Sequence, residues 1–480
     1  MKKARNLIVL LALAATLHIA AMTPQEAVNK FLSDNSLRYA SVGVNVIDLD
    51  SAKSIASHLP DQADITASTM KTVVSSAALG MLGPHFRFET PVYLDGEVKN
   101  GHFKGNIIIQ GVGDPTLGSI YLPRQARIVQ EIVDALRARG ITKVEGCIVG
   151  DDSLYAFPCY DEDWDVGDLP YDYGTAVHGL SFHDNLVTVS FTVDDQQNVT
   201  ATSFTPAVPG LQMTNRLRKG RQRDAITAYM DYSVPAMVLT GEAAAKTYND
   251  TYANPDPAAM LVDSVEQALA HCSDIQFKRN AAAHDGLRHA ERTLLVLHRS
   301  PQLTEIITSL LDRSDNMFAH ALLRAMGARE WEQRGQGIMP PEIDAIGVAA
   351  VKRWLRNQGI DTDALFMRDG SGLARANKAS VNFFGEMLTM MAHRRFDGVR
   401  LCDLMPTASG RAGKTLKASP LSSRIVLKSG SMRHVQCFVG YYPADEPRYA
   451  FAVLVNNFTC SQSAIREQIG VLLTDLFEGR

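Results

Sequence analysis

Hydrophobic and polar positions divide the chain into stretches of two kinds. Residues 23–82 and those after about Leu294 combine helical periodicity with short alternating runs. Between about residues 87 and 289 the pattern changes to short strand signals and many turn residues, without a helical repeat comparable to the flanks. The pattern therefore predicts a long β-rich insertion within a mixed unit to which both chain ends contribute.

The N-terminal stretch predicts a helix, two strands and a second helix. Thr23-Pro24-Gln25-Glu26 has the form of a capping box with proline at the first helical position, and it opens an amphipathic helix to about Leu37. Alternation predicts a strand over 39–49 and another near 54–59. An alanine-rich helix then begins at Ser68, and we expect most of its faces to be buried.

The C-terminal part predicts two consecutive helices, three strands and a last helix. The first helix leads into Ser314 with five apolar residues on one face: Leu303, Ile306, Ile307, Leu310 and Leu311. The next begins at Asn316. Antiparallel strands follow at 424–428, 435–442 and 449–458, and an amphipathic helix from about 463 to 477 ends the chain.

A candidate nucleophile lies at the start of the alanine-rich helix. Ser68 and Lys71 are three residues apart, so their side chains share one helical face. A neutral Lys71 amine would take the Ser68 proton and activate the hydroxyl. Burial would lower the lysine pKa, and a second ammonium such as that of Lys428 would lower it further. A Ser-x-x-Lys match alone is weak, because most such matches are solvated helix ends.

Two further motifs accompany it in order. Ser314-Asp315-Asn316 lies between two helical segments, and Lys428-Ser429-Gly430-Ser431 ends an apolar run. An earlier Ser-Asp-Asn at 33–35 precedes the nucleophile, and we interpret it as helix capping. The set resembles that of the penicillin-interacting serine acyltransferases. The long gap between Ser68 and Ser314, which a single-domain β-lactamase has no room for, narrows the resemblance to the low-molecular-mass class C penicillin-binding proteins, the D-alanyl-D-alanine carboxypeptidases/endopeptidases.

The resemblance implies a fold and a domain plan. We expect an α/β (α+β) fold: a serine-β-lactamase-like transpeptidase domain, with a mostly antiparallel sheet between helices, and a large β-rich insertion of two nested subdomains. The expected limits are 22–86 with 290–480 for the catalytic domain, 87–114 with 189–289 for the first subdomain, and 115–188 for the second. Within the insertion the resemblance covers Gly111 through Leu117, Gly150-Asp151-Asp152-Ser153, Trp164 with Asp168-Leu169, and 180–185. Asp369-Gly370-Ser371-Gly372-Leu373 matches a family segment that lines the back of the site, with or without a direct substrate role.

The resemblance also assigns roles to the motif residues. Ser68 would attack the carbonyl of a D-Ala-D-Ala-type bond in a peptidoglycan stem peptide, Lys71 would receive its proton, and Ser314 would relay that proton to the leaving amine. Four residues would bind substrate or shape its site: Asn316, Lys428, Ser429 and Gly430. The backbone N–H groups of Ser68 and Ser431 would form the oxyanion hole. The family usually has threonine at 429 and 431, and serine keeps the hydroxyl. β-Lactam antibiotics would acylate Ser68, and no cofactor or metal is expected.

Residues 1–21 have the basic, apolar, small-residue order of a secretory signal peptide, with cleavage expected after Ala21. The apolar run is shorter than the roughly 20 residues of a spanning helix, so we expect a periplasmic mature protein, soluble or peripherally membrane-associated, without a transmembrane anchor.

The composition gives little further information about partners. A net charge of −4 gives no electrostatic reason to expect nucleic-acid binding. The six cysteines permit disulfides without predicting them, and buried free thiols are the favoured interpretation for most. The oligomeric state stays open.

Other functions remain as alternatives. A β-lactamase would share the acylation step but needs fast deacylation, and an esterase on this fold would share Ser68 and Lys71. A non-catalytic peptidoglycan-binding or scaffold protein would keep the fold with an unreactive serine. The chain lacks the Gly-x-Ser-x-Gly of a Ser-His-Asp hydrolase and the His-Glu-x-x-His of a zinc amidase.

The insertion would restrict which peptides enter the site. Asp165 or Asp168 would contact a cationic diamino-acid end of the substrate.

Overall fold

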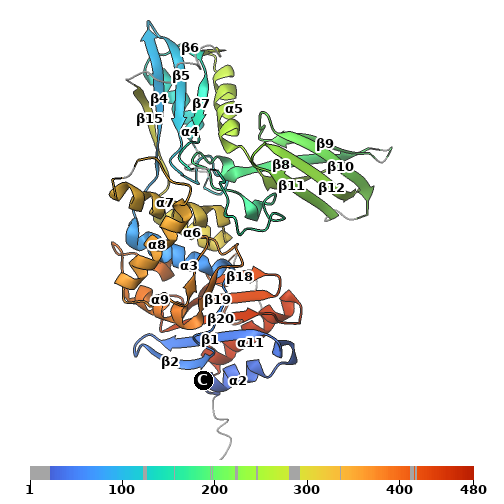
Figure 1. Ribbon diagram of the computed structural model, residues 1–480, viewed down its shortest axis with the longest axis vertical. Helices are drawn as coiled ribbons and strands as arrows, with labels where there is room; N and C mark the ends of the chain where they lie inside the picture. The colour runs from blue at the N-terminus through green and yellow to red at the C-terminus, as the bar shows by residue number, and fades with distance from the viewer. Residues whose placement is uncertain are drawn as a thin grey trace, which may run out of the picture.

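The computed structural model describes residues 22–479 except 123–126, 156, 195, 197, 222–224, 245–246, 281–291, 336, 411–415 and 417–418. The expected signal peptide lies outside the described residues and stays a prediction. Figure 1 shows an elongated molecule, with a mixed α/β unit at the lower end and the β-rich insertion at the upper end. The fold class that the sequence predicts is confirmed.

A five-stranded antiparallel sheet forms the centre of the mixed unit. Its strands are β1 (Ser41–Asp48), β2 (Lys53–His58), β18 (Val426–Met432), β19 (Val435–Tyr442) and β20 (Tyr449–Asn456). The order is β18-β19-β20-β1-β2, so strands from the two ends of the chain lie side by side. Every residue of β19 and β20 is buried, because helices cover both faces of the sheet.

Alternate residues of the central strands enter two different cores. On one face α2 (Pro24–Leu32) and α11 (Gln462–Glu478) share a core with Phe438 and Val453. The core on the other face contains Val439 and Ala452. The helices on that face are α3 (Met70–Met81), α6 (Leu303–Arg313), α7 (Asn316–Gln333), α8 (Ile343–Asn357) and α9 (Val381–His393). The predicted sheet between helices is therefore present.

The first helix begins as predicted and ends earlier. Thr23 and Glu26 form the capping box, with Pro24 in the first turn. The helix ends at Leu32, because the Asp34 side chain accepts a hydrogen bond from the backbone N of Ser36 (2.8 Å) and caps a separate 3-10 turn, η1 (Asn35–Leu37). Capping by the early Ser-Asp-Asn is confirmed, while the predicted helix was five residues too long.

Short elements complete the mixed unit. They are β3 (Ala63–Ile65), the 3-10 turn η2 (Ala67–Thr69), β16 (Leu365–Phe366), β17 (Lys378–Ser380) and α10 (Leu401–Leu404). The order β16-β17-β3 makes a small sheet that leads the chain into η2 and α3. The nucleophile turn is thus held at the junction of this sheet with the helical layer.

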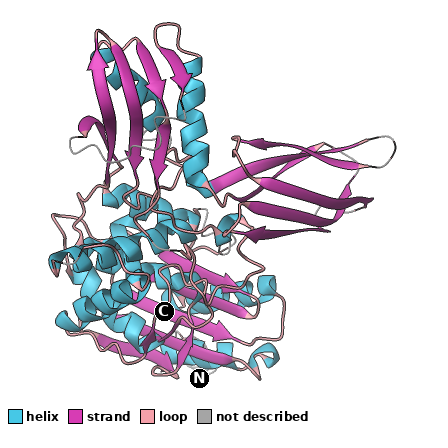
Figure 2. Ribbon diagram, turned by 45° about the horizontal axis from the view of Figure 1, so that its top comes forward, coloured by secondary structure: helices cyan, strands magenta, loops and turns pink. Residues whose placement is uncertain are grey.

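A six-stranded sheet forms the first half of the insertion. Its strands are β4 (Glu89–Lys99), β5 (His102–Gln110), β6 (Lys143–Gly146), β7 (Ile148–Asp151), β14 (Gln276–Arg279) and β15 (Thr293–Arg299). The helices α4 (Ile128–Ala138) and α5 (Pro257–Ala270) pack beside it (Figure 2). We expected no comparable helical repeat in the insertion, which was wrong for both helices. The buried Ile132, Val133 and Leu136 of α4 follow helical spacing, as do the buried Met260, Leu261 and Val265 of α5.

Two three-stranded sheets form the second half and extend to one side of the molecule (Figure 1). Their strands are β8 (Leu186–Val193), β9 (Val199–Thr205), β10 (Gln212–Gly220), β11 (Ala225–Asp231), β12 (Ala236–Ala244) and β13 (Tyr248–Ala253), in the orders β13-β8-β9 and β10-β12-β11. The strand pairing crosses the limits that we expected. Residues 143–151 pair with β5, and β15, which we placed in the catalytic domain, pairs with β4. One sheet thus joins segments that we assigned to different domains, and the exact domain limits stay a prediction.

All six cysteines are free thiols, and four of them are buried: Cys147, Cys159, Cys402 and Cys437. The favoured interpretation of buried free thiols is confirmed for these four. Within residues 22–479, as far as they are described, no helix has the length and apolar character to cross a membrane.

Candidate active site

The turn that carries Ser68 is tightly enclosed. Ser68 lies in η2, directly before α3. Ala67 is buried with a φ of 44°, a left-handed conformation that costs a non-glycine residue roughly 1–2 kcal/mol. Two glycines let other backbone segments approach: a Cβ at Gly372 would collide with Ala67 O, and one at Gly430 would lie 2.7 Å from Thr66 O. Surrounding backbone therefore fixes the position of the Ser68 hydroxyl.

Lys71 follows Ser68 by one turn and is fully buried. Its Nζ lies 2.8 Å from Ser68 Oγ, 2.5 Å from Asn316 Oδ1 and 2.7 Å from Ser371 O. A carbonyl oxygen has no proton to give, so Ser68 is the one partner among these three that can donate a proton to a neutral amine. The geometry therefore suits proton transfer from Ser68 to Lys71.

Burial lowers the pKa of Lys71 to about 7, and the carboxylates of Asp369 and Asp315 oppose the decrease. A substantial part of the amine is then neutral near neutral pH, as a general base requires. Burial also lowers the pKa of Lys428 well below its ordinary value, and the charge of Lys71 lowers it further. The repulsion between the two ammonium groups acts on the pair, because each charge disfavours the charged form of the other.

Ser314 lies at the junction of α6 and α7 in a left-handed conformation, with φ 61° and ψ 41°. Its Oγ accepts a hydrogen bond from Lys428 Nζ (2.8 Å), and the same amine donates to Ser429 O (2.7 Å). The following residue, Asp315, caps α7, because its Oδ1 accepts a hydrogen bond from the backbone N of Phe318 (3.0 Å).

Asn316 links the two halves of the site. Its Oδ1 faces Lys71, and its Nδ2 donates to the main-chain carbonyl of Tyr173 (2.7 Å), in the 3-10 turn η3 (Asp172–Gly174) of the insertion. The Tyr173 carbonyl fixes which way the amide faces, because a carbonyl only accepts hydrogen bonds and therefore has to face the amide nitrogen. One N–H of Nδ2 donates to Tyr173 O, which leaves the second N–H for a substrate carbonyl.

The third motif lies on β18, beside the nucleophile. Gly430 faces the backbone of η2, and Ser431 is exposed with its Oγ donating to Gln436 Oε1 (2.8 Å). Ser431 and Ser68 both line one cavity of about 900 Å³, together with Ser314 and Asn316. The structure therefore brings the three sequence motifs together around a single cleft.

The insertion and the 369–373 segment form other walls of this cavity. Asp163, Asp165, Asp168 and Tyr173 line it from the insertion. Gly372 and Leu373 line it from the 369–373 turn, so the expected place of that segment is confirmed. The Asp369 side chain is fully buried among donors of its own turn, which leaves no substrate role for it.

Sequence reasoning missed the main-chain carbonyls of Ser371 and Tyr173, which contact Lys71 and Asn316. Residue type gives no signal for a carbonyl, because every residue has one. Among the described residues, no group of three or more His, Cys, Asp or Glu side chains is placed to hold a metal ion.

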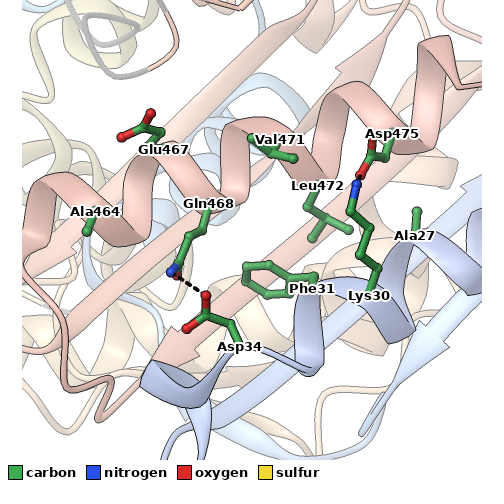
Figure 3. Close-up of a pocket in the computed structure, with 10 residues that line it drawn as sticks. All are labelled: Ala27, Lys30, Phe31, Asp34, Ala464, Glu467, Gln468, Val471, Leu472 and Asp475. Carbon is green, nitrogen blue, oxygen red and sulfur yellow. Dashed lines mark hydrogen bonds and ion pairs between the residues drawn. The ribbon is translucent and has the colours of Figure 1, made fainter.

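A second cavity, of about 380 Å³, lies far from this chemistry between α2 and α11 (Figure 3). Phe31 and Leu472 line it. Lys30 of α2 pairs with Asp475 of α11 (2.7 Å), and Gln468 of α11 donates to Asp34, which follows α2 (3.0 Å). It has the features of a helix–helix interface, and none of the three motifs reaches it.

The fold and the arrangement of hydroxyl and amine groups define the class of the chain: a serine peptidase of the penicillin-interacting kind. A family model narrows the class. The model described as the D-Ala-D-Ala carboxypeptidase 3 (S13) family matches residues 24–476, and the chain belongs to this family. It is a serine-type D-Ala-D-Ala peptidase.

Individual proteins agree with this assignment. The chain is 25% identical over 474 residues to a D-alanyl-D-alanine carboxypeptidase from Actinomadura sp. (strain R39), covering 94% of this chain and 84% of the relative. The crystal structure of penicillin binding protein 4 (dacB) from Haemophilus influenzae superposes with a TM-score of 0.76 and 21% identity, over 94% of this chain and 98% of that one. A second structure of that protein, complexed with a β-lactam, has a TM-score of 0.72 and 21% identity, with 94% and 97% covered. These likenesses extend over the insertion as well as the mixed unit.

Proposed function

We propose that Ser68 is the residue acylated in the peptidase reaction and that Lys71 is its general base. The observation that carries the proposal is the set of three partners around the Lys71 amine, of which Ser68 has the only transferable proton. The Ser68 oxygen attacks the carbonyl carbon of the penultimate D-alanine while its proton moves to Lys71 Nζ. The C–N bond then breaks, and a proton passes through Ser314 to the leaving amine. Water hydrolyses the resulting ester.

Charge complementarity supports the orientation of the substrate. The terminal carboxylate of a stem peptide would lie at Lys428 and Ser429, because a charged donor to a carboxylate makes a strong hydrogen bond. Asn316 would donate to an amide carbonyl of the peptide. The N–H groups of Ser68 and Ser431 would stabilise the oxyanion, which contributes roughly 3–4 kcal/mol in other acyl transferases.

The same site accounts for both proposed substrates. In a carboxypeptidase reaction the leaving amine belongs to free D-alanine, and in a DD-endopeptidase reaction it belongs to a neighbouring cross-linked peptide. A cationic diamino-acid end would lie against Asp165 or Asp168, both of which line the cavity. Incubation with cross-linked and uncross-linked muropeptides would separate the two activities.

The location of the enzyme is part of the proposal. Peptidoglycan lies outside the inner membrane, and the basic, apolar, small-residue order of residues 1–21 supports export. N-terminal sequencing of mature protein should begin near Met22. An intact Met1 in a cytosolic extract would contradict export.

Labelling with a fluorescent penicillin tests the catalytic assignment. A β-lactam bears a strained amide and a carboxylate, and its leaving group stays tethered after ring opening, so the adduct should be long-lived. Ser68→Ala should abolish the label, and Lys71→Ala should nearly abolish it, because an unactivated hydroxyl is a weak nucleophile. Loss of the adduct within seconds would favour the β-lactamase alternative. An adduct on another residue would refute the role of Ser68.

A further inference from the structure

The insertion meets the catalytic unit at one buried tryptophan. The Trp164 side chain is 4% exposed, although Asp163 and Asp165 on either side of it line the substrate cavity. Its indole Nε1 donates to Asp369 Oδ2 (2.9 Å), across the boundary between insertion and catalytic unit. The ring packs in a small apolar cluster with Leu169, Ala176, Tyr232 and Ala374. Trp164 is therefore enclosed and has no face toward a bound peptide.

Asp369 organises the turn that Trp164 reaches. Its Oδ1 accepts hydrogen bonds from the backbone N of Ser371 (2.7 Å) and of Gly372 (2.6 Å). Its Oδ2 accepts from Ala374 N (2.7 Å) and Asn377 Nδ2 (3.1 Å), besides the indole. A fully buried carboxylate needs such donors, because an unsatisfied one would be costly. The indole is the one donor from the insertion among these contacts.

The 369–373 turn contacts both the base, Lys71, and the backbone next to the nucleophile, Ser68. Ser371 O accepts a hydrogen bond from Lys71 Nζ (2.7 Å), and Gly372 packs directly on the carbonyl of Ala67, the residue before the nucleophile. A displaced turn would therefore move the base and the backbone of the nucleophile together. A shift of about 1 Å at a catalytic group costs on the order of 100-fold in rate.

We propose that Trp164 is a positioning residue for acylation: by donating to Asp369 it holds the turn whose Ser371 carbonyl orients Lys71 and whose Gly372 supports the nucleophile turn. The insertion is then part of the catalytic apparatus as well as a wall of the cleft. The negative charge of Asp369 also opposes the decrease in the pKa of Lys71, so this carboxylate influences the base electrostatically as well as through the turn. The inference rests on the proposed roles of Ser68 and Lys71.

The test compares the two constants of acylation by penicillin: the affinity of the reversible complex and the rate constant of the covalent step. Trp164→Phe keeps an aromatic ring and removes the N–H. We expect its acylation rate constant to fall by roughly tenfold or more, with the affinity within about twofold of wild type, because Lys428, Ser429 and Asn316 are unchanged. A role in binding would instead weaken the affinity of the reversible complex and leave the rate constant of the covalent step unchanged, which would overturn the proposal.

Trp331→Phe is the matched control, because it also removes an indole N–H that donates a hydrogen bond. The acceptors of Trp331 Nε1 are the main-chain carbonyls of Gly337 (3.3 Å) and Ile338 (3.2 Å), outside the site. It should acylate at the wild-type rate.

If Trp164→Phe does not fold, a variant with the benzothiophene isostere of tryptophan at 164 keeps the ring shape and lacks only the N–H. A rate constant within about twofold of wild type in the folded variant would overturn the proposal. Mass spectrometry of the wild-type adduct first establishes that Ser68 is labelled, so that failure of the proposed function is distinguishable from failure of the positioning role.

Discussion

Gly430 has no room for a side chain, because it lies against the backbone of Ser68. A Cβ at Gly430 would lie 2.9 Å from Ser68 N and 3.0 Å from Thr69 N. These are backbone atoms, and they cannot move aside without moving the nucleophile. The third sequence motif thus fixes the geometry of the first through the absence of a side chain, in addition to supplying Lys428.

Gly430→Ala should lower the rate of acylation by penicillin by about 100-fold, the order of effect expected for a catalytic group displaced by about 1 Å. Stopped-flow fluorescence with a reporter penicillin measures this rate. Gly337→Ala is the control, since a Cβ at Gly337 meets no atom within 4 Å. Equal rates for Gly430→Ala and wild type would show that the backbone around Ser68 adapts freely.

Lys428→Ala should affect substrates according to their charge. A hydrogen bond between charged groups contributes about 1.5–3 kcal/mol, so acylation by a β-lactam with a free carboxylate should slow by roughly 10- to 100-fold. An activated ester without a carboxylate should lose much less. Parallel rate measurements with both substrates test this prediction, and an equal loss for both would place Lys428 in proton transfer instead.

Ser314 combines a useful hydroxyl with a strained backbone. Glycine adopts a positive φ without the roughly 1–2 kcal/mol penalty of other residues, so Ser314→Gly should be about 1 kcal/mol more stable than Ser314→Ala. Both variants lack the hydroxyl and should react slowly with penicillin. Urea denaturation of the two variants gives the difference. Equal stability would mean that the left-handed conformation is relieved when the hydroxyl is removed.

The sequence predicted those parts of the site that depend on side-chain chemistry. Ser68, Lys71, Ser314, Asn316 and Lys428 were found by residue type and spacing, and the structure brings them together. The central strands and their helices were also predictable, because alternation and helical spacing directly record which face is buried.

Features that depend on the backbone and on long-range pairing were not predictable. The left-handed φ of Ser314 and the carbonyl of Tyr173 leave no trace in residue type. In the insertion, local signals located turns and strands. However, β6 and β7 both pair with β5, as in His102 with Lys143 and Ile107 with Ile148. No local signal specifies which strand is the partner of another. The contact from Trp164 to Asp369 joins residues 205 positions apart and was likewise invisible.

Acylation should depend on pH through Lys71. The base must be neutral to accept the Ser68 proton, and burial lowers its pKa to about 7. The second-order rate of acylation of the free enzyme should therefore rise with pH, reach half its plateau near pH 7 and level off about one to two pH units above that midpoint. An unperturbed lysine would place the midpoint near pH 10.4.

The opposite limb belongs to another residue. Lys428 has to be charged to attract a carboxylate, and burial lowers its pKa well below the ordinary value even when Lys71 is neutral. Loss of its proton should therefore weaken acylation at higher pH for β-lactams that bear a carboxylate, but not for the ester without one. The acidic limb should be the same for both substrates, because it reports Lys71. Rates measured from pH 5.5 to 10 with both substrates separate the two lysines. A rate that does not change between pH 5.5 and 8 would exclude a neutral Lys71 as the base, since a titrating base must reduce the rate once it is protonated.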